Sequence, residues 1–149
     1  TVRHVSPGDA TMAIDSLALG LDLTLRDEQN RLRKAGKPWE LAKAFDHAAP
    51  IGDFSAFQPD INLEAIRFGC KVNGTLRQQG DTAHMIFSIP RIISILSSTW
   101  TLLPGDLIYT GTPAGVGPLQ VGDQIMLEGT GLKSAQWTIS ADDAPQKIG

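Results

Sequence analysis

The chain has 149 residues, of which 42% are hydrophobic and 19% charged, with a mean hydropathy of −0.06, a balance typical of a globular protein with a buried core. The formal net charge is −3 and no run of Lys or Arg stands out, so the composition argues against a nucleic-acid partner. The most apolar stretch, residues 92–103, is interrupted by five Ser and Thr side chains and is too short to span a bilayer, so no membrane association is expected.

The N-terminal half is predicted to hold one strand and one helix. Residues 16–24 are mostly apolar and are predicted to form a strand. Thr24-Leu-Arg-Asp27 resembles a capping box and predicts a helix that begins near residue 25 and ends at Gly36, just before Pro38. Residues 38–52 are expected to be irregular, with at most one helical turn.

The C-terminal half is predicted to be richer in strands. Residues 65–72 and 75–79 flank Asn73-Gly74, the strongest short-range signal for a hairpin. Ser88-Ile-Pro90 predicts the start of a second helix, because proline is favoured in the first helical turn. The remaining predictions are a strand at 107–110, a loop at 111–117 and a last hairpin formed by 123–128 and 133–139. The total is a mainly β fold with a few helices (α+β), read as a single domain over residues 1–149.

Three polar residues in the N-terminal half are candidates for a site. Asp22 closes an apolar strand, where a carboxylate is costly unless it is paired, hydrogen-bonded or bound to a metal. Hard cations such as Mg²⁺ prefer such oxygen ligands, although a salt-bridged or capping aspartate is the commoner case. Arg26 and Gln29 lie three residues apart and share a helix face near the strand end. Their side chains suit a carboxylate, and solvated helix residues are the alternative.

Further candidates lie in loops. Lys43, among small and aromatic neighbours, would be half-buried beside a charge partner, or else an ordinary surface lysine. The glycine-rich loop 111–117 lacks the Gly-Lys-Ser/Thr ending of a phosphate loop, but its N–H groups and the Thr112 hydroxyl suit a small carboxylate. The three histidines share no zinc-ligand spacing. Cys70 is expected in the core, and a single cysteine favours a reducing, cytoplasmic location.

Taken together and in order, these motifs resemble the fumarylacetoacetate hydrolase family, over residues 8–128. They are Gly20-Leu-Asp-Leu-Thr-Leu-Arg-Asp27 with Gln29, Gly36-Lys-Pro-Trp39, Ala42-Lys-Ala-Phe-Asp46, Val72-Asn-Gly74, Arg77-Gln78, Leu102-Leu-Pro-Gly-Asp106 and Thr110-Gly-Thr-Pro-Ala-Gly-Val-Gly117. The match is nearest to the acylpyruvate and fumarylpyruvate hydrolase branch. The resemblance implies a mixed β-sandwich roll, here without its N-terminal strands, and a homodimer.

The resemblance also implies roles for individual residues. Asp22 matches a metal ligand for Mg²⁺ (or Mn²⁺), Lys43 the active-site lysine beside the metal, and Arg26, Gln29 and Thr112 match substrate-binding positions. The family takes two further metal ligands from a Glu-x-Glu motif, and a catalytic His and Glu from a lid helix, both upstream of the matched region. The chain contains neither, so the sequence resembles the C-terminal two-thirds of a member, with two Glu ligands expected upstream of Thr1.

The function implied is metal-dependent hydrolysis of the C–C bond of acylpyruvate-type 2,4-dioxo acids, such as fumarylpyruvate or acetylpyruvate, with release of pyruvate. The partner expected is therefore a small 2-oxo acid. A decarboxylase or isomerase of an aromatic-degradation pathway, or an oxaloacetate decarboxylase, is the alternative on the same fold. An inactive dimerising fragment is the alternative of another class. For the enzyme, Asp22, Lys43 and Thr112 are predicted to meet at one cavity.

Overall fold

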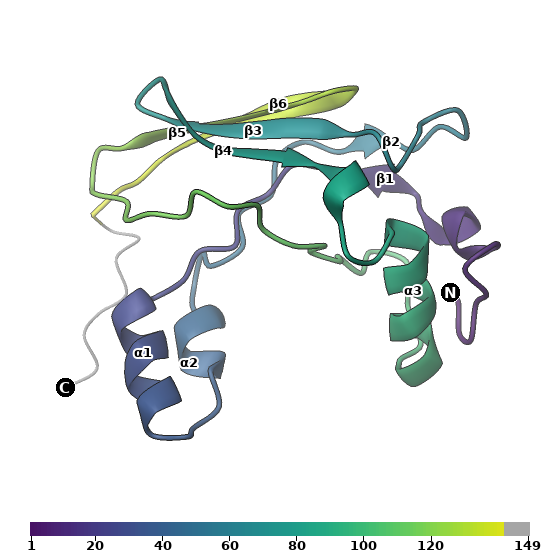
Figure 1. Cartoon of the computed structure of the whole chain (residues 1–149), viewed down its shortest axis with the longest axis horizontal. Helices are drawn as coiled ribbons and strands as arrows, with labels where there is room; N and C mark the ends of the chain where they lie inside the picture. Colours follow the sequence, from purple (N-terminus) through teal and green to yellow (C-terminus); the bar gives the residue numbers. More distant parts are fainter. Residues whose placement is uncertain (142–149) are drawn as a thin grey trace.

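The computed structural model describes residues 1–141 and shows an α+β fold built on a four-stranded antiparallel sheet (Figure 1). The strand order is β4-β3-β5-β6, and β1 and β2 form a separate antiparallel pair. Helices α1, α2 and α3 lie on one side of the sheet in the view of Figure 1. The elements are η1 (Ala10–Ala13), β1 (Ser16–Leu17), α1 (Arg26–Lys34), α2 (Glu40–Lys43), β2 (Ser55–Ala56), β3 (Arg67–Val72), β4 (Thr75–Asp81), η2 (Thr82–His84), α3 (Ile89–Thr99), β5 (Gln124–Gly129) and β6 (Leu132–Thr138).

Both predicted hairpins are confirmed. The turn between β3 and β4 is Asn73-Gly74, with φ of 51° and 76°. Two left-handed residues are what a two-residue turn needs in order to match the twist of its strands. The second hairpin joins β5 to β6, and β3 pairs with β5, so the two hairpins form one sheet.

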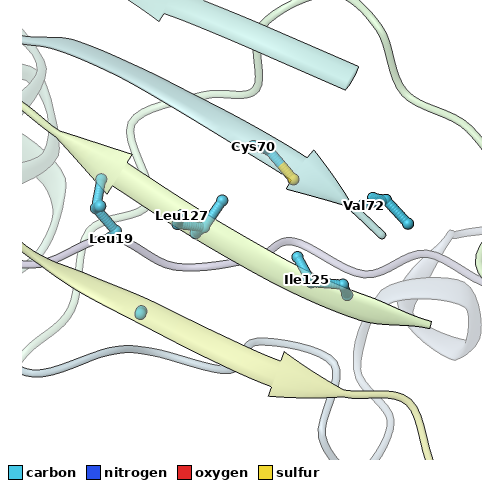
Figure 2. Close-up of a cluster of buried hydrophobic side chains, with 6 residues drawn as sticks. Leu19, Cys70, Val72, Ile125 and Leu127 are labelled. Atoms are coloured by element: carbon cyan, nitrogen blue, oxygen red, sulfur yellow. The ribbon is translucent and has the colours of Figure 1, made fainter. Parts of the chain in front are cut away.

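The core lies on one face of this sheet (Figure 2). Cys70 is opposite Leu127 and Val72 is opposite Ile125, so these four side chains share a face, where Leu19 packs against them. The opposite face is more exposed and carries an ion pair between Lys71 and Glu128. This alternation is typical of an antiparallel sheet with one solvated face.

The two longer helices lie where they were predicted, with one correction. α3 has Ser88 at its N-cap position and a proline in its first turn, as expected. α1 begins at Arg26, and the predicted capping box at Thr24 is wrong, because the N-cap residue is Leu25 and no side chain caps the helix. The Leu25 N–H donates to the carbonyl of Ala42 at 3.1 Å, so the chain is still paired with a neighbouring segment at this point and turns into the helix one residue later.

Two predicted strands need correction. Only Ser16–Leu17 of the strand predicted at 16–24 is regular, since its partner segment contains Pro50, which has no N–H to return a ladder bond. Residues 18–25 are instead an extended segment held by isolated hydrogen bonds. The strand predicted at 107–110 is also wrong: this segment belongs to a long irregular stretch that passes beneath the sheet without a strand partner among residues 1–141 (Figure 1).

Candidate metal and substrate site

Asp22 and Lys43 are brought together by two extended segments that run antiparallel. The Leu21 N–H donates to the carbonyl of Pro50 at 2.9 Å and the Leu23 N–H to that of Ala48 at 2.8 Å. This register places the end of the short helix α2 beside residue 22, and Lys43 Nζ donates to Asp22 Oδ1 at 2.7 Å. The two side chains are 35% and 44% exposed, so the pair lies at the surface of the site and within reach of a ligand.

Arg26 and Gln29 form a second pair, on the first turn of α1. Arg26 Nη1 donates to Gln29 Oε1 at 2.5 Å. The bond joins residues three apart on one helix face, as predicted from their spacing. It fixes the orientation of the exposed guanidinium, which lies four residues after Asp22.

The Gly-Thr-Pro loop that carries Thr112 is attached to strand β4. Gln78 Nε2 donates to the carbonyl of Pro113 at 3.0 Å. Gly115 has a φ of 99° and lies so close to β4 that a Cβ there would be 2.0 Å from the carbonyl oxygen of Arg77. Glycine is required at such a position both for its conformation and for the close approach. The attachment fixes where Thr112 stands relative to the sheet.

These residues surround one cavity of about 1630 Å³ between the sheet and the irregular segments beneath it. Asp22, Arg26 and Thr112 are among its lining residues, and the rest of the wall is largely apolar. Lys43 and Gln29 are not lining residues, but each is hydrogen-bonded to a residue that is. The structure therefore pairs Asp22 with Lys43 and Arg26 with Gln29, and it places Asp22, Arg26 and Thr112 around one cavity. Lys43 was predicted to line the same cavity and does not. The chemical roles of the five residues stay predictions.

Tyr109 lines the same cavity and was not singled out from the sequence. Burial raises the pKa of its phenol above the usual range, and the negative charge of Asp22 raises that pKa further. Its position next to Thr110-Gly-Thr112 was the only sequence signal available, and a lone tyrosine beside a loop is ordinarily a packing residue.

The donor set at Asp22 suits a hard cation in kind but not in number. A carboxylate oxygen is a ligand that Mg²⁺ and Mn²⁺ prefer. Within residues 1–141, however, no group of three or more His, Cys, Asp and Glu side chains could hold a metal ion. The described residues therefore supply fewer than three such side chains at this position.

Residues 1–140 match the family model described as fumarylacetoacetate (FAA) hydrolase, C-terminal. The chain belongs to the fumarylacetoacetate hydrolase family. Oxaloacetate tautomerase YcgM of Escherichia coli is 44% identical over 126 residues, which are 84% of this chain and 58% of that protein. The chain spans 54% to 62% of the length of curated relatives that it matches.

Two solved structures show the same fold. Fumarylpyruvate hydrolase from Pseudomonas aeruginosa, in complex with Mn²⁺ and pyruvate, is 34% identical with a TM-score of 0.88, over 93% of this chain and 60% of its own. The 5-carboxymethyl-2-hydroxymuconate delta-isomerase from Mycobacterium smegmatis is 32% identical with a TM-score of 0.83, over 93% and 53%. The chain thus spans a little over half the length of these relatives, and the predicted family and α+β fold are confirmed.

The family comprises enzymes with several activities, and its members in this comparison include a hydrolase, a tautomerase and an isomerase. The complex with Mn²⁺ and pyruvate shows that a divalent metal is bound in the family. For the part of this chain that the structure describes, every helix falls short of the length and apolar character that a membrane crossing needs.

Proposed function

We propose that this chain contributes one side of a divalent-metal site at which a small 2-oxo acid is converted through its enolate. The observation that carries the proposal is the Asp22–Lys43 contact of 2.7 Å, beside a cavity that Arg26 and Thr112 also line. An anionic oxygen donor and a cation thus lie next to each other, and two groups suited to a carboxylate line the same cavity as the donor.

Asp22 would hold the metal, Mg²⁺ or Mn²⁺, with two Glu ligands from a Glu-x-Glu segment that this sequence does not contain. The relative that binds Mn²⁺ together with pyruvate supports a divalent cation and a 2-oxo acid. A metal bound there would act as a Lewis acid on an oxygen of the substrate.

The other residues would act on the substrate itself. The Lys43 ammonium adds positive charge where an enolate oxygen develops, which is a preorganised electrostatic contribution. Arg26, oriented by Gln29, offers its fork to a carboxylate, and the Thr112 hydroxyl with the N–H groups of its loop completes the positioning.

The reaction we propose is hydrolysis of the C–C bond of acylpyruvates, with release of pyruvate. It is supported by the structural likeness to fumarylpyruvate hydrolase. Tautomerisation of oxaloacetate is the second candidate, favoured by the 44% identity to the Escherichia coli enzyme. The two reactions share the enolate and differ in whether a C–C bond breaks.

The test compares the 149-residue chain with a version extended at Thr1 by a Glu-x-Glu segment. We expect the chain as given to bind Mg²⁺ weakly and to turn over neither acetylpyruvate nor oxaloacetate, because one carboxylate provides little of the charge that the cation needs. The extended chain should bind Mg²⁺ and act on one of the two substrates, and Asp22→Ala should abolish both properties.

Calorimetry and the two substrate assays give the deciding results. Micromolar Mg²⁺ binding by the chain as given would show that the ligand set is wrong. An extended chain that binds Mg²⁺ normally after Asp22→Ala would contradict the proposal and favour an interaction role instead.

We propose in addition that the chain forms a homodimer in a reducing cytoplasm. The proposal is supported by the family and by large exposed apolar side chains such as Ile86, which is 94% exposed. Light scattering should report twice the monomer mass at micromolar concentration; a stable monomer at high concentration would contradict the dimer.

A further inference from the structure

Tyr109 is a single side chain that contacts both extended segments of the site. Its hydroxyl donates to the carbonyl of Ala49 at 2.8 Å and lies 3.4 Å from that of Pro50. Its ring lies against Gly20 so closely that a Cβ at Gly20 would be 3.0 Å from Tyr109 Cε1. The ring therefore occupies space that any larger residue at position 20 would take.

The residues that Tyr109 contacts lie close in the sequence to the residues of the proposed site. Gly20 lies two residues before Asp22 on one segment. On the other segment, the Pro50 carbonyl accepts the Leu21 N–H. Pro50 follows Lys43 in the sequence. Tyr109 itself lies three residues before Thr112. One side chain thus connects the segments that carry the ion pair to the loop that carries the threonine.

Ordinary packing is a weak explanation for this arrangement. Tyr109 is 41% exposed, so its ring could pack while its hydroxyl pointed to solvent. Its hydroxyl is nevertheless directed at backbone carbonyls within the site, near enough to Asp22 for the carboxylate charge to raise the pKa of the phenol, in addition to the effect of burial.

We propose that Tyr109 is a positioning residue that sets the distance between the Asp22–Lys43 pair and Thr112, and thereby the length of the 2-oxo acid that fits between them. Tyr109 acts through the two segments and the loop and makes no bond to the substrate. The inference rests on the proposed function of Asp22 and Thr112, and its test must therefore separate the two.

The experiment uses the 149-residue chain and Mn²⁺ alone as the probe. A small, substoichiometric amount of Mn²⁺ should broaden the amide signals of Leu23 and Thr112 in NMR spectra, each according to its distance from a metal at Asp22. In Tyr109→Phe the ring remains and the hydroxyl is lost, so we expect the broadening at Thr112 to fall relative to that at Leu23. Tyr109→Ala should lower it further.

Two controls separate positioning from loss of structure. Trp100→Phe alters an exposed aromatic side chain at the end of α3 and should leave the ratio of the two broadenings unchanged. Urea unfolding of Tyr109→Phe should show a cooperative transition like that of the parent chain, so a changed ratio then reports displacement of the loop within a folded protein.

The possible results of the NMR experiment separate the positioning role of Tyr109 from the proposed function. A ratio that is the same in the parent and in both Tyr109 variants would overturn the positioning role and leave the proposed function standing. Broadening that persists in Asp22→Asn would overturn the proposed function, and this inference with it. A ratio that falls in Tyr109→Phe, while Asp22→Asn abolishes the broadening, supports the positioning role of Tyr109 and a metal position at Asp22.

Discussion

The sheet and the site are built in different ways. In the sheet, β3, β4, β5 and β6 are joined by antiparallel ladders, with one irregularity in the register of β3–β4 and one in that of β5–β6. The central side chain, Ile125, has no exposed surface. The site region consists of residues 18–25, 42–54 and 103–119, which are mostly irregular and are held by single contacts between segments. Each of those contacts, such as the one between Asp22 and Lys43, therefore determines a site geometry that no ladder fixes.

The site region also leaves apolar side chains exposed. Leu103, Leu107 and Val116 are 55%, 53% and 62% exposed, although all three line the cavity. In the sheet, the apolar side chains of the core face, Cys70, Val72, Ile125 and Leu127, are buried, whereas Leu76 and Met126 are 54% and 37% exposed. The comparison indicates that the sheet supplies most of the stability, whereas the site region is the part of the chain that local opening would affect first.

The largest expected effect comes from weakening the sheet itself. Ile125→Ala removes most of a fully buried side chain and should lower the free energy of unfolding by about 2–5 kcal/mol. The matched control is Met126→Ala, one residue along the same strand and 37% exposed, which should cost about 0.5 kcal/mol. Urea unfolding measures both; equal losses would contradict a core confined to one face.

The next effect comes from the attachment of the loop to β4. Gly115→Ala combines a left-handed φ with a collision at the Arg77 carbonyl. The backbone strain alone should lower the free energy of unfolding by about 1–3 kcal/mol. The collision should in addition displace the loop from β4. Gly111→Ala has a φ of 134° but meets no atom within 4 Å, so it should strain the backbone without displacing the loop.

The Gln78 side-chain amide reports on this displacement, because it donates to the carbonyl of Pro113. Its NMR signal should shift strongly in Gly115→Ala and only slightly in Gly111→Ala. Similar shifts in the two variants would mean that the close approach to β4 does not hold the loop.

The same contrast explains how much of the fold could be predicted from the sequence. The β3–β4 hairpin and the start of α3 were predictable, because Asn73-Gly74 and Pro90 constrain the backbone locally. The strand at 107–110 was predicted wrongly, because a strand requires a partner strand. The apolar run at 107–110 does not by itself indicate whether such a partner is present.

For the candidate site, the sequence suggested residues, whose roles stay predictions, but it did not indicate their contacts. Family-like motifs identified Asp22, Lys43 and Thr112, but their distances depend on the register of two irregular segments, which has no local sequence signal. Tyr109 was missed for the same reason, since its importance lies in contacts with Gly20 and Ala49, 89 and 60 residues earlier in the chain.

A smaller effect is expected from the ion pair of the site region. Lys43→Met removes a cation that lies 2.7 Å from the proposed metal ligand. Mg²⁺ should then bind more tightly, by about thirtyfold, since a divalent and a monovalent cation about 4 Å apart in water repel by about 2 kcal/mol. Lys37→Met, an exposed lysine in the same stretch, is the control and should change the affinity little. Calorimetry with unchanged affinity in Lys43→Met would contradict a metal site at Asp22.

The smallest effect concerns the junction of the two regions, where the irregular stretch enters β5. Asp123 accepts the Gln120 N–H at 2.7 Å and the Asn73 amide at 2.8 Å, so it connects this stretch to the β3–β4 turn. The backbone bond from Gln120, with the Asn73 bond and the charge of Arg77 adding to it, holds the pKa of Asp123 below its usual value.

A lowered pKa in the folded state means that the ionised carboxylate stabilises the fold. The contribution is fully present above the usual pKa of an unfolded aspartate, about 4, and is lost as the pH falls through the lowered value. Asp123→Asn should therefore unfold at a lower urea concentration than the parent chain at pH 7, and the gap should close in acid. The control is Asp60→Asn, at an exposed position in a turn. A gap between Asp123→Asn and the parent that stays constant from pH 7 into acid would show that the amide itself, and not the lost charge, weakens the junction between the sheet and the site.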